Sequence, residues 1–221
     1  MNTQKTLVKS LLFTAFTAVS AISSAQTADE ILSRLSEQAQ AFKTINASYE
    51  STLVDLKNDF TEEMSGNILI EGDSFNLDLG DYLIVCDGTT VWTYDTEANE
   101  CYIDDADMLI EEGMDPSKIF TIWEDDFKTE LKGNSEFNGK MCTQINLYPN
   151  DGEDKAYHTI QLFIHDDGSS LEVLRMVVKG REGNNTEYLI NKFETGVAIP
   201  DGTFQFSSDK FPGVEIIDNR I

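Results

Sequence analysis

Residues 82–103, YLIVCDGTTVWTYDTEANECYI, contain three short runs of β-forming residues separated by two turn sequences. Asp87-Gly88 is a dipeptide typical of two-residue hairpin turns, and residues 95–99 provide a second loop. The stretch therefore predicts three consecutive antiparallel strands. A two-residue turn pairs Cys86 with Thr89, and this register assigns each side chain to one face of the sheet.

Two rows of side chains follow from this register. Ile84, Val91 and Ile103 align on one face, which carries no formal charge. The other face carries Trp92 and Tyr94 together with two acidic residues. Because burial of an unpaired carboxylate is costly, the row of Ile84 is predicted to face the interior. The row of Trp92 is predicted to face outward or to pack under a loop, where amphipathic rings are well accommodated.

The cysteine content argues against a disulfide scaffold. Three cysteines, Cys86, Cys101 and Cys142, are an odd number. The expected register separates Cys86 from Cys101 by two strands and several residues, roughly 14–16 Å. A disulfide needs Cα atoms within about 7 Å, so this pair is excluded if the register holds. A bridge to Cys142 remains open, and free buried thiols are the expectation.

The same period-two alternation continues on both sides of this meander. Short alternating runs joined by turn sequences extend from about residue 45 to about residue 194, with Asn138-Gly139 as another hairpin dipeptide. They add up to about ten or eleven antiparallel strands, so the fold class is mainly β. Long meanders avoid exposed edges by curling or closing, which favours a curled sheet with amphipathic helices on its concave side.

Two helices are expected to cover this sheet. Thr27-Ala28-Asp29-Glu30 has the form of a capping box, and apolar residues follow it at helical spacing up to Phe42. This pattern predicts a helix over residues 28–42. Asp115-Pro116 is a second helix start, and it predicts a short central helix over residues 116–123.

The amino terminus has the pattern of a secretory signal peptide. Lys5 and Lys9 precede an apolar run over residues 11–22, and small residues up to Ala25 form a cleavage site. We expect residues 1–25 to be removed and residues 26–221 to form one exported domain. Without Lys5 and Lys9, 14 basic residues oppose 40 acidic ones, a net charge of −26. Such a surface repels nucleic acid and anionic lipid headgroups.

Catalytic and metal-binding motifs are not found in the sequence. His158 and His165 are the two histidines, and their odd spacing places them on opposite faces if one strand carries both. No nucleophile elbow, C-x-x-C pair or calcium-loop spacing occurs. No metal or cofactor is therefore expected, and the chain is not expected to be an enzyme, although its 40 acidic residues leave a catalytic carboxylate pair open.

Several segments, in the order in which they occur, resemble the outer-membrane lipoprotein carrier proteins, the LolA family. Asp87-Gly88, Trp92 and Tyr94 match the hairpin of that family. Further matches are residues 66–70 with 75–77, Pro116 with Ile119-Phe120, residues 147–149, and the tail from Phe204 to Asp218. The resemblance covers nearly the whole mature chain. One departure is Glu71-Gly72-Asp73, which stands where well-studied members carry a basic residue and a proline tied to release of the cargo.

The resemblance implies an incomplete antiparallel β-barrel of about eleven strands, with a helical lid over a hydrophobic cavity. It also implies a periplasmic carrier that takes the acyl chains of lipoproteins from an inner-membrane ABC transporter and passes them to an outer-membrane acceptor. A monomer is expected.

The alternation of each strand indicates which side chains should line the cavity. We expect one set of apolar residues to face inward from the sheet: Ile68, Ile70, Phe75, Leu77, Leu79, Ile84, Val91, Ile103, Ile145, Leu147, Ile160, Leu162, Ile164, Leu174 and Met176. The lid should contribute Leu35, Phe42, Phe120 and Trp123.

Two other functions remain open at this point. A lipid-sensing or amphiphile-binding periplasmic protein could share the fold, and a hydrolase could use a pair of aspartate or glutamate residues. A close acidic pair in a polar cleft would favour the hydrolase.

Overall fold

The computed structural model describes residues 26–111, 121–124, 126–151 and 155–220, without the side chains of 109–111. Twelve strands form one sheet in the order β12-β6-β5-β4-β3-β2-β1-β11-β10-β9-β8-β7. The strands are β1 (Thr44–Asp55), β2 (Phe60–Glu71), β3 (Ser74–Asp78), β4 (Tyr82–Cys86), β5 (Thr90–Asp95), β6 (Glu100–Asp105), β7 (Phe127–Phe137), β8 (Lys140–Pro149), β9 (Tyr157–Asp166), β10 (Leu171–Gly180), β11 (Asn184–Thr195) and β12 (Glu215–Asp218). The helices are α1 (Ala28–Gln40), α2 (Ala106–Glu111) and the 3₁₀ turns η2 (Ile122–Glu124) and η4 (Ser208–Lys210).

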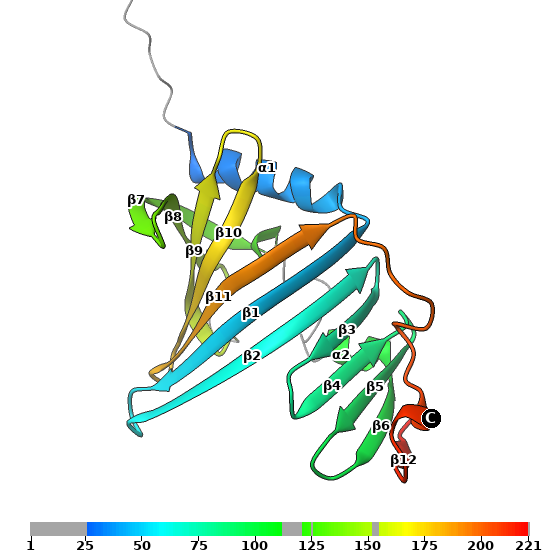
Figure 1. Cartoon of the computed structure of the whole chain (residues 1–221). Coiled ribbons are helices and arrows are strands. Elements are labelled where there is room, and N and C mark those ends of the chain that lie inside the picture. The colour runs from blue at the N-terminus through cyan, green and yellow to red at the C-terminus, as the bar shows by residue number, and fades with distance from the viewer. Residues whose placement is uncertain (1–25, 112–120, 125, 152–154, 221) are drawn as a thin grey trace, which may run out of the picture.

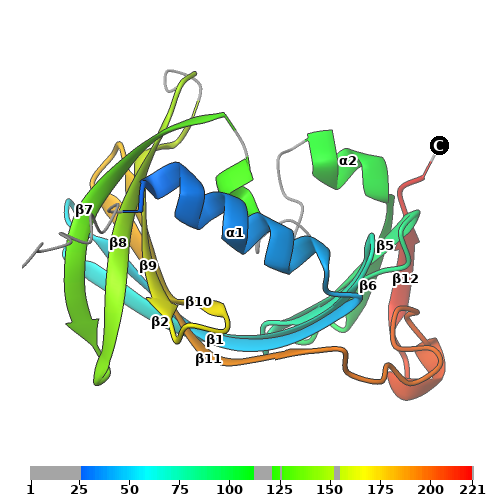
Figure 2. The same ribbon diagram turned by 90° about the horizontal axis from the view of Figure 1, so that it is seen from above.

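The sheet curls into a half-barrel that does not close. Two runs of sequential strands, β1 to β6 and β7 to β11, join where β1 pairs antiparallel with β11. β12 adds a parallel strand beside β6, so β12 and β7 form the two outer edges. Figure 2 shows α1 lying inside the curve of the sheet, with α2 near one rim. The predicted incomplete antiparallel barrel is confirmed, with one strand more than expected.

Helix α1 begins at the predicted capping box. The Thr27 hydroxyl accepts the backbone N–H of Glu30 at 3.2 Å, and the Glu30 carboxylate accepts the backbone N–H of Thr27 at 2.9 Å. Its apolar stripe buries Ile31, Leu32 and Leu35 against the sheet. The helix ends at Gln40, two residues before the predicted end. The predicted central helix falls mostly on residues 112–120, outside the described residues.

The buried side chains form three clusters. One joins the stripe of α1 to β8, β9 and β10, and a second joins β1 to β5 with Ala106 of α2. Both lie on the concave face of the sheet. The third lies on the convex face, where Cys142, Phe163 and Val177 pack with Leu174 and Phe137. Residues on alternate positions of β9 and β10 therefore enter different clusters, which explains why Leu171–Lys179 is almost continuously apolar.

The first hairpin of the opening stretch differs from the prediction. Cys86 pairs with Val91 instead of Thr89, because the turn extends to Thr90. The Asp87 carboxylate accepts the N–H groups of Thr89 and Thr90 at 3.0 and 2.9 Å, and it stabilises this longer loop. The shift is two residues, so every side chain keeps its predicted face.

The second hairpin differs by one residue, which moves side chains to the other face. Trp92 pairs with Ile103, where Val91 was expected. The Asp95 carboxylate accepts the N–H groups of Glu97 and Ala98, both at 2.9 Å, and fixes a four-residue loop. Directly opposed residues share a face, so the prediction that Ile103 points inward is wrong.

The convex face of β4, β5 and β6 is covered by the carboxyl-terminal segment. Tyr94 is 7% exposed, and its ring lies 4.3 Å from that of Phe211 and 5.7 Å from that of Phe206. The Tyr94 hydroxyl donates to the Asn99 side chain at 3.0 Å. The row of Trp92 was expected to face outward or to pack under a loop, and Tyr94 follows the second expectation. All three cysteines are buried and none of them forms a disulfide, as expected.

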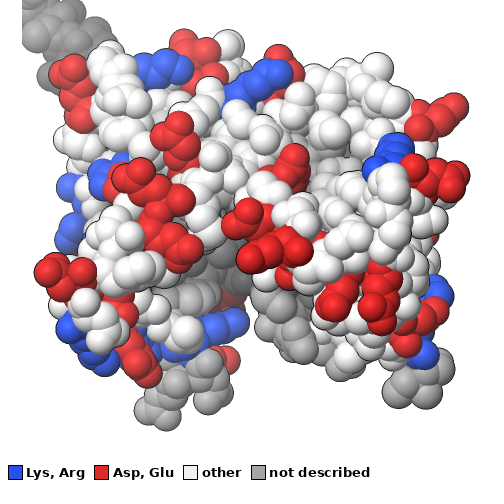
Figure 3. Space-filling model, turned by 60° about the horizontal axis from the view of Figure 1, so that its bottom comes forward, with Lys and Arg blue, Asp and Glu red and all other residues white. Residues whose placement is uncertain are grey.

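Acidic groups dominate the surface. Figure 3 shows Asp and Glu side chains spread over one face with fewer Lys and Arg among them, in keeping with a net charge of −24 for the whole chain. Among the described residues, no helix has the length and apolar character needed to cross a membrane.

Candidate functional site

Most of the predicted ligand residues lie together on the concave face of the half-barrel. The cluster under α1 contains Leu35, Trp123, Ile145, Leu147, Ile160, Leu162, Ile164 and Met176. The neighbouring cluster contains Phe42, Ile68, Ile70, Phe75, Leu77, Leu79, Ile84 and Val91. Ile103 lies on the opposite face of the sheet, Leu174 packs with the convex cluster, and Phe120 lies outside the described residues. Two apolar clusters thus lie side by side on the concave face, and α1 covers the first of them.

Much of this surface is packed core rather than open cavity. Ile145, Leu147 and Ile160 are fully buried. The interior cavity, between Tyr49, Ile68, Leu162, Met176 and Tyr188, measures about 30 Å³, whereas one water needs roughly 10–15 Å³. Among the described residues, side chains therefore nearly fill this part of the apolar interior.

Trp123 forms one side of that interior and is tied to the helix. Its indole N–H donates to the Ser36 hydroxyl of α1 at 2.9 Å, while the ring is 8% exposed. The hydrogen bond satisfies the buried polar group of an otherwise apolar ring. Through Ser36, this hydrogen bond ties η2, which carries the predicted lid residue Trp123, to α1, which carries the predicted lid residue Leu35.

Two tyrosines place hydroxyl groups in this apolar interior. The rings of Tyr49 and Tyr188 meet edge to face with centroids 5.9 Å apart. Burial raises the pKa of both hydroxyls, and the proximity of Tyr188 raises the pKa of Tyr49 further. Both groups are therefore neutral at physiological pH and can act as hydrogen-bond donors to an uncharged ligand group.

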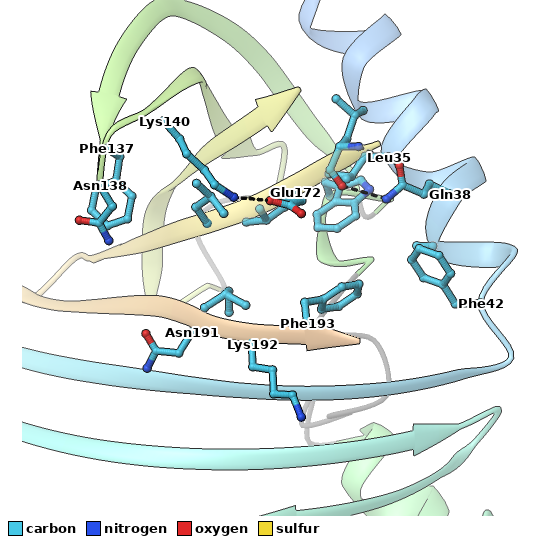
Figure 4. A pocket seen from close by; sticks show the side chains of 16 residues that line it. Leu35, Gln38, Phe42, Phe137, Asn138, Lys140, Glu172, Asn191, Lys192 and Phe193 are labelled. Atoms are coloured by element: carbon cyan, nitrogen blue, oxygen red, sulfur yellow. Dashed lines mark hydrogen bonds and ion pairs between the residues drawn. The ribbon is translucent and has the colours of Figure 1, made fainter. Parts of the chain in front are cut away.

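A larger cavity of about 360 Å³ opens at the edge of this interior. Its volume falls in the range of roughly 300–1,000 Å³ that is typical of ligand pockets. Figure 4 shows side chains of α1, of the β7–β8 turn and of β10 and β11 converging on it. They are Leu35, Gln38, Ala39, Phe42, Trp123, Phe137, Asn138, Lys140, Leu171, Glu172, Val173, Leu174, Ile190, Asn191, Lys192 and Phe193.

The cavity exists because β10 and β11 separate. They pair only from Arg175 with Leu189 to Lys179 with Asn185, and beyond that point they diverge toward α1 (Figure 1). Each strand carries an extra residue at this point, Leu174 in β10 and Asn191 in β11. Such bulges bend a strand and end its regular pairing.

The bulge in β10 also explains why Leu174 packs on the convex face, although it lines the cavity. Val173 pairs with Ile164 and Arg175 pairs with Phe163, so Leu174 has no partner of its own. Its side chain packs with the convex cluster, whereas Met176 lies inside as predicted. Arg175 also lies on the convex face, where its guanidinium stands 4.7 Å from the centroid of the Phe163 ring.

Helix α1 takes the place of the missing strand at the opening. The Gln38 side-chain amide donates to the Leu171 carbonyl at 2.8 Å and accepts the Leu171 N–H at 2.9 Å. A neighbouring strand would make the same two hydrogen bonds. The separated edge of β10 is thereby satisfied at this position without closing the sheet.

The cavity opening has more basic than acidic residues, whereas acidic residues predominate in the chain as a whole. The lining contains Lys140, Lys192 and one acid, Glu172, whereas the chain has 16 basic and 40 acidic residues. Lys140 pairs with Glu172 at 2.9 Å, and Lys192 pairs with Glu194 at 2.7 Å. These pairs are about half exposed, so the ammonium groups remain available at little free-energy cost.

The described residues do not group into a metal centre. No cluster of three or more His, Cys, Asp or Glu side chains with suitable geometry occurs among them. His158 Nδ1 is 2.8 Å from the Thr159 hydroxyl, and His165 Nδ1 is 2.9 Å from the Met141 carbonyl. Burial raises the pKa of Cys101 to about 11, so this thiol is protonated and unreactive.

Several residues of the site were missed by the sequence analysis. Tyr188 and Ile190 alternate along β11, and that period could have identified them. Phe193 could not be found in this way, because the bulge at Asn191 shifts the alternation by one. Phe193 instead contacts Phe42 edge to face, with ring centroids 5.8 Å apart.

The segment Glu71-Gly72-Asp73, where the sequence departs from the pattern of the resembling family, forms a tight turn. Glu71 pairs with Ser74, which leaves Gly72-Asp73 as a two-residue hairpin loop with Gly72 at φ +58°. A left-handed conformation at this position suits glycine and excludes proline, whose φ is fixed near −65°.

Several solved structures are similar to this chain. An uncharacterized conserved protein from Thermus thermophilus superposes with a TM-score of 0.54 at 14% identity, over 88% of this chain and 100% of its own. A LolA superfamily protein from Nitrosomonas europaea gives 0.45 at 12% identity, over 82% and 99%. The lipoprotein LppX from Mycobacterium tuberculosis gives 0.49 at 11%, over 79% and 100%.

No curated protein matches the chain by sequence. The likeness to the Thermus protein shows a shared fold and no more. Residues 40–207, however, match the family model described as outer membrane lipoprotein carrier protein LolA, which covers most of the chain. The protein therefore belongs to the LolA family of outer membrane lipoprotein carrier proteins.

Proposed function

We propose that this protein is a periplasmic carrier that shields the acyl chains of lipoproteins during their transfer from the inner to the outer membrane. Residues 1–25 serve as the signal peptide and residues 26–221 as the carrier domain. The donor is an inner-membrane ABC transporter and the recipient an outer-membrane acceptor. The observation that carries the proposal is the apolar concave face of the half-barrel, covered by α1, in a chain of the LolA family.

The energetics favour a carrier of this kind. Burying one CH₂ group is worth about 0.8 kcal/mol, so one long acyl chain is worth on the order of 12 kcal/mol. A lipoprotein with two or three chains would not leave a membrane at a useful rate unaided. A carrier must shield these chains yet release them, and an apolar interior without strong specific contacts meets both needs.

The surface charge suits a protein that works between two membranes. Without the signal peptide its net charge is −26, which opposes adsorption to anionic headgroups. Contact with a membrane would then depend on specific donor and acceptor proteins rather than on non-specific attraction.

The proposal is tested by the cargo that the protein carries. The chain is expressed in its own periplasm, purified without detergent and examined by native mass spectrometry. Acylated lipoproteins should be found bound. Protein without any lipid would contradict the proposal, and free lipid without protein would point instead to an amphiphile-binding protein of the same fold.

A transfer assay adds a matched pair of variants. Inner-membrane vesicles loaded with a triacylated lipoprotein are incubated with the protein, and the cargo in the soluble fraction is measured. Met176→Trp fills the interior cavity, whereas Met108→Trp alters a residue that is 49% exposed. Release of cargo should be lost in the first variant and retained in the second, with both showing the circular dichroism of the folded protein.

A further inference from the structure

The cavity at the separation of β10 and β11 crosses the sheet. Its lining includes Leu35 and Leu171 from the cluster on the concave face. It also includes Phe137 and Leu174, which pack in the cluster on the convex face. A single cavity that touches both clusters joins the two faces through the gap between the strands.

We propose that this gap is the entrance through which an acyl chain passes into the half-barrel, while the polar head of the same ligand stays at the convex rim. The inference rests on the proposed carrier function and adds the route and the site of the head. The ligand is an amphiphile with at least one acyl chain and a head rich in hydrogen-bond acceptors.

Side chains along the route change from polar to apolar. Exposed donors from Asn138, Lys140, Asn191 and Lys192 stand at the rim. Figure 4 shows Leu35 and Phe42 on the α1 side of the cavity and Phe137 and Asn138 on the opposite side. Amide and ammonium groups donate hydrogen bonds, so they fit carboxylate, phosphate or ester oxygens. The apolar side chains deeper in the cavity fit the acyl chain of the ligand.

The entrance leads directly to the interior cavity. Trp123, Val173 and Ile190 line both cavities and form the partition between them. Rotation of these side chains would connect the rim to the space beside Tyr49 and Tyr188. No strand needs to separate further, because the bulges at Leu174 and Asn191 already hold the strands apart.

The frame of the entrance is stable, whereas its inner edge can rearrange. The two hydrogen bonds between Gln38 and Leu171 fix α1 to β10. Next to Gln38 on the α1 side (Figure 4), Phe42 meets Phe193 edge to face, and Phe193 is 38% exposed. Rotation of these rings alters the width of the opening without breaking a backbone hydrogen bond.

The entrance is tested with a dansylated undecanoic acid, whose fluorescence rises in an apolar site. Association is followed by stopped flow with the wild-type chain and with Leu174→Trp and Asn191→Trp, which fill the gap. Association should slow by about tenfold or more in both variants, because the gap between β10 and β11 is then open in only a small fraction of the protein molecules. The matched control is Met141→Trp, at a residue that is 57% exposed and does not line the cavity, and it should bind at the wild-type rate.

The position of the head is tested separately. Lys192→Gln should weaken binding of the carboxylate probe and leave binding of its methyl ester nearly unchanged. Equal effects on both probes would place the head elsewhere.

Labelling of the wild-type chain avoids any dependence on folding of the variants. A fatty acid with a terminal diazirine is photoactivated at successive times after mixing, and the modified residues are identified by mass spectrometry. Early label on Leu174, Ile190 or Phe193, followed by label beside Tyr188, supports the entrance. Binding with label confined to the interior at all times, or with unchanged rates in the folded tryptophan variants, overturns it. No binding of any acyl probe by the wild-type chain would instead reject the proposed function as well.

Discussion

Substitution of Gly66 by alanine should displace a ring in the interior. Gly66 lies directly opposite Tyr49, and a Cβ added there would stand 2.5–2.8 Å from three atoms of the Tyr49 side chain. Ordinary contacts are 3.4–4 Å, so the ring must move by roughly 1 Å. The interior cavity beside it measures about 30 Å³, and Tyr188 stands against its edge.

The expected change in stability combines three contributions. Overpacking costs about 1–3 kcal/mol, and loss of the edge contact with Tyr188 costs about 0.5–1.5 kcal/mol. Alanine recovers about 0.5–1 kcal/mol, because glycine is unfavourable in a strand interior. Gly66→Ala should therefore lower the free energy of unfolding by about 2 kcal/mol, within a range of about 0.5–4 kcal/mol. For a chain of this size a loss of about 2 kcal/mol should lower the melting temperature by about 4–8 °C.

Urea denaturation followed by circular dichroism measures this change in two backgrounds. In Tyr49→Ala the ring is absent, so adding Gly66→Ala should be neutral or stabilising by up to about 1 kcal/mol. The coupling free energy between Gly66→Ala and Tyr49→Ala tests whether the cost comes from a clash with the Tyr49 ring. If Gly66→Ala were equally destabilising in both backgrounds, the cost would come from the backbone, and the steric account of Gly66 would be refuted.

Three further predictions concern other parts of the molecule. Thr27→Ala should lower the free energy of unfolding by about 1 kcal/mol in urea titrations, because the capping box of α1 is lost; no change would mean that its packing alone fixes the helix. Hydrogen bonds from Ser169 and Ser170 lower the pKa of Asp167 in the folded protein. The Asp167 carboxylate therefore stabilises the fold above the unfolded pKa near 4, and this stabilisation is lost as pH falls toward the folded pKa. Asp167→Asn should thus be less stable than wild type at pH 7, with the difference shrinking below about pH 4; a difference independent of pH would contradict this. The buried thiols, Cys101 among them, should react with a colorimetric thiol reagent only after denaturation; rapid reaction of the native protein would show that they are accessible.

The sequence predicts the fold well, because the fold follows from regular patterns. The capping box of Thr27 and Glu30 locates α1, and the alternation of strands such as β8 and β9 identifies their inward residues. The half-barrel follows from the number of short strands together with two amphipathic segments to cover them. These signals are local or periodic, so they can be read without a structure.

The failures occur where one residue interrupts a period. Loop length at Asp95 depends on whether its carboxylate bonds to the following N–H groups, and that choice moved Ile103 to the other face. Extra residues at Leu174 and Asn191 change the alternation within β10 and β11. No composition signal marks these bulges, since both segments remain compatible with a regular strand. The position of the larger cavity was missed for the same reason, because it lies where β10 and β11 both depart from regular alternation.

The pairing of β1 with β11 has a consequence for how the chain reaches this structure. Ile45 pairs with Thr195, 150 positions later in the sequence. Contacts between such distant positions form slowly, because the intervening chain must first lose much of its freedom. The two halves of the concave surface cannot meet until nearly the whole chain is available. An incompletely synthesised chain therefore has no enclosed apolar interior. The ability to bind an apolar ligand appears only as folding is completed.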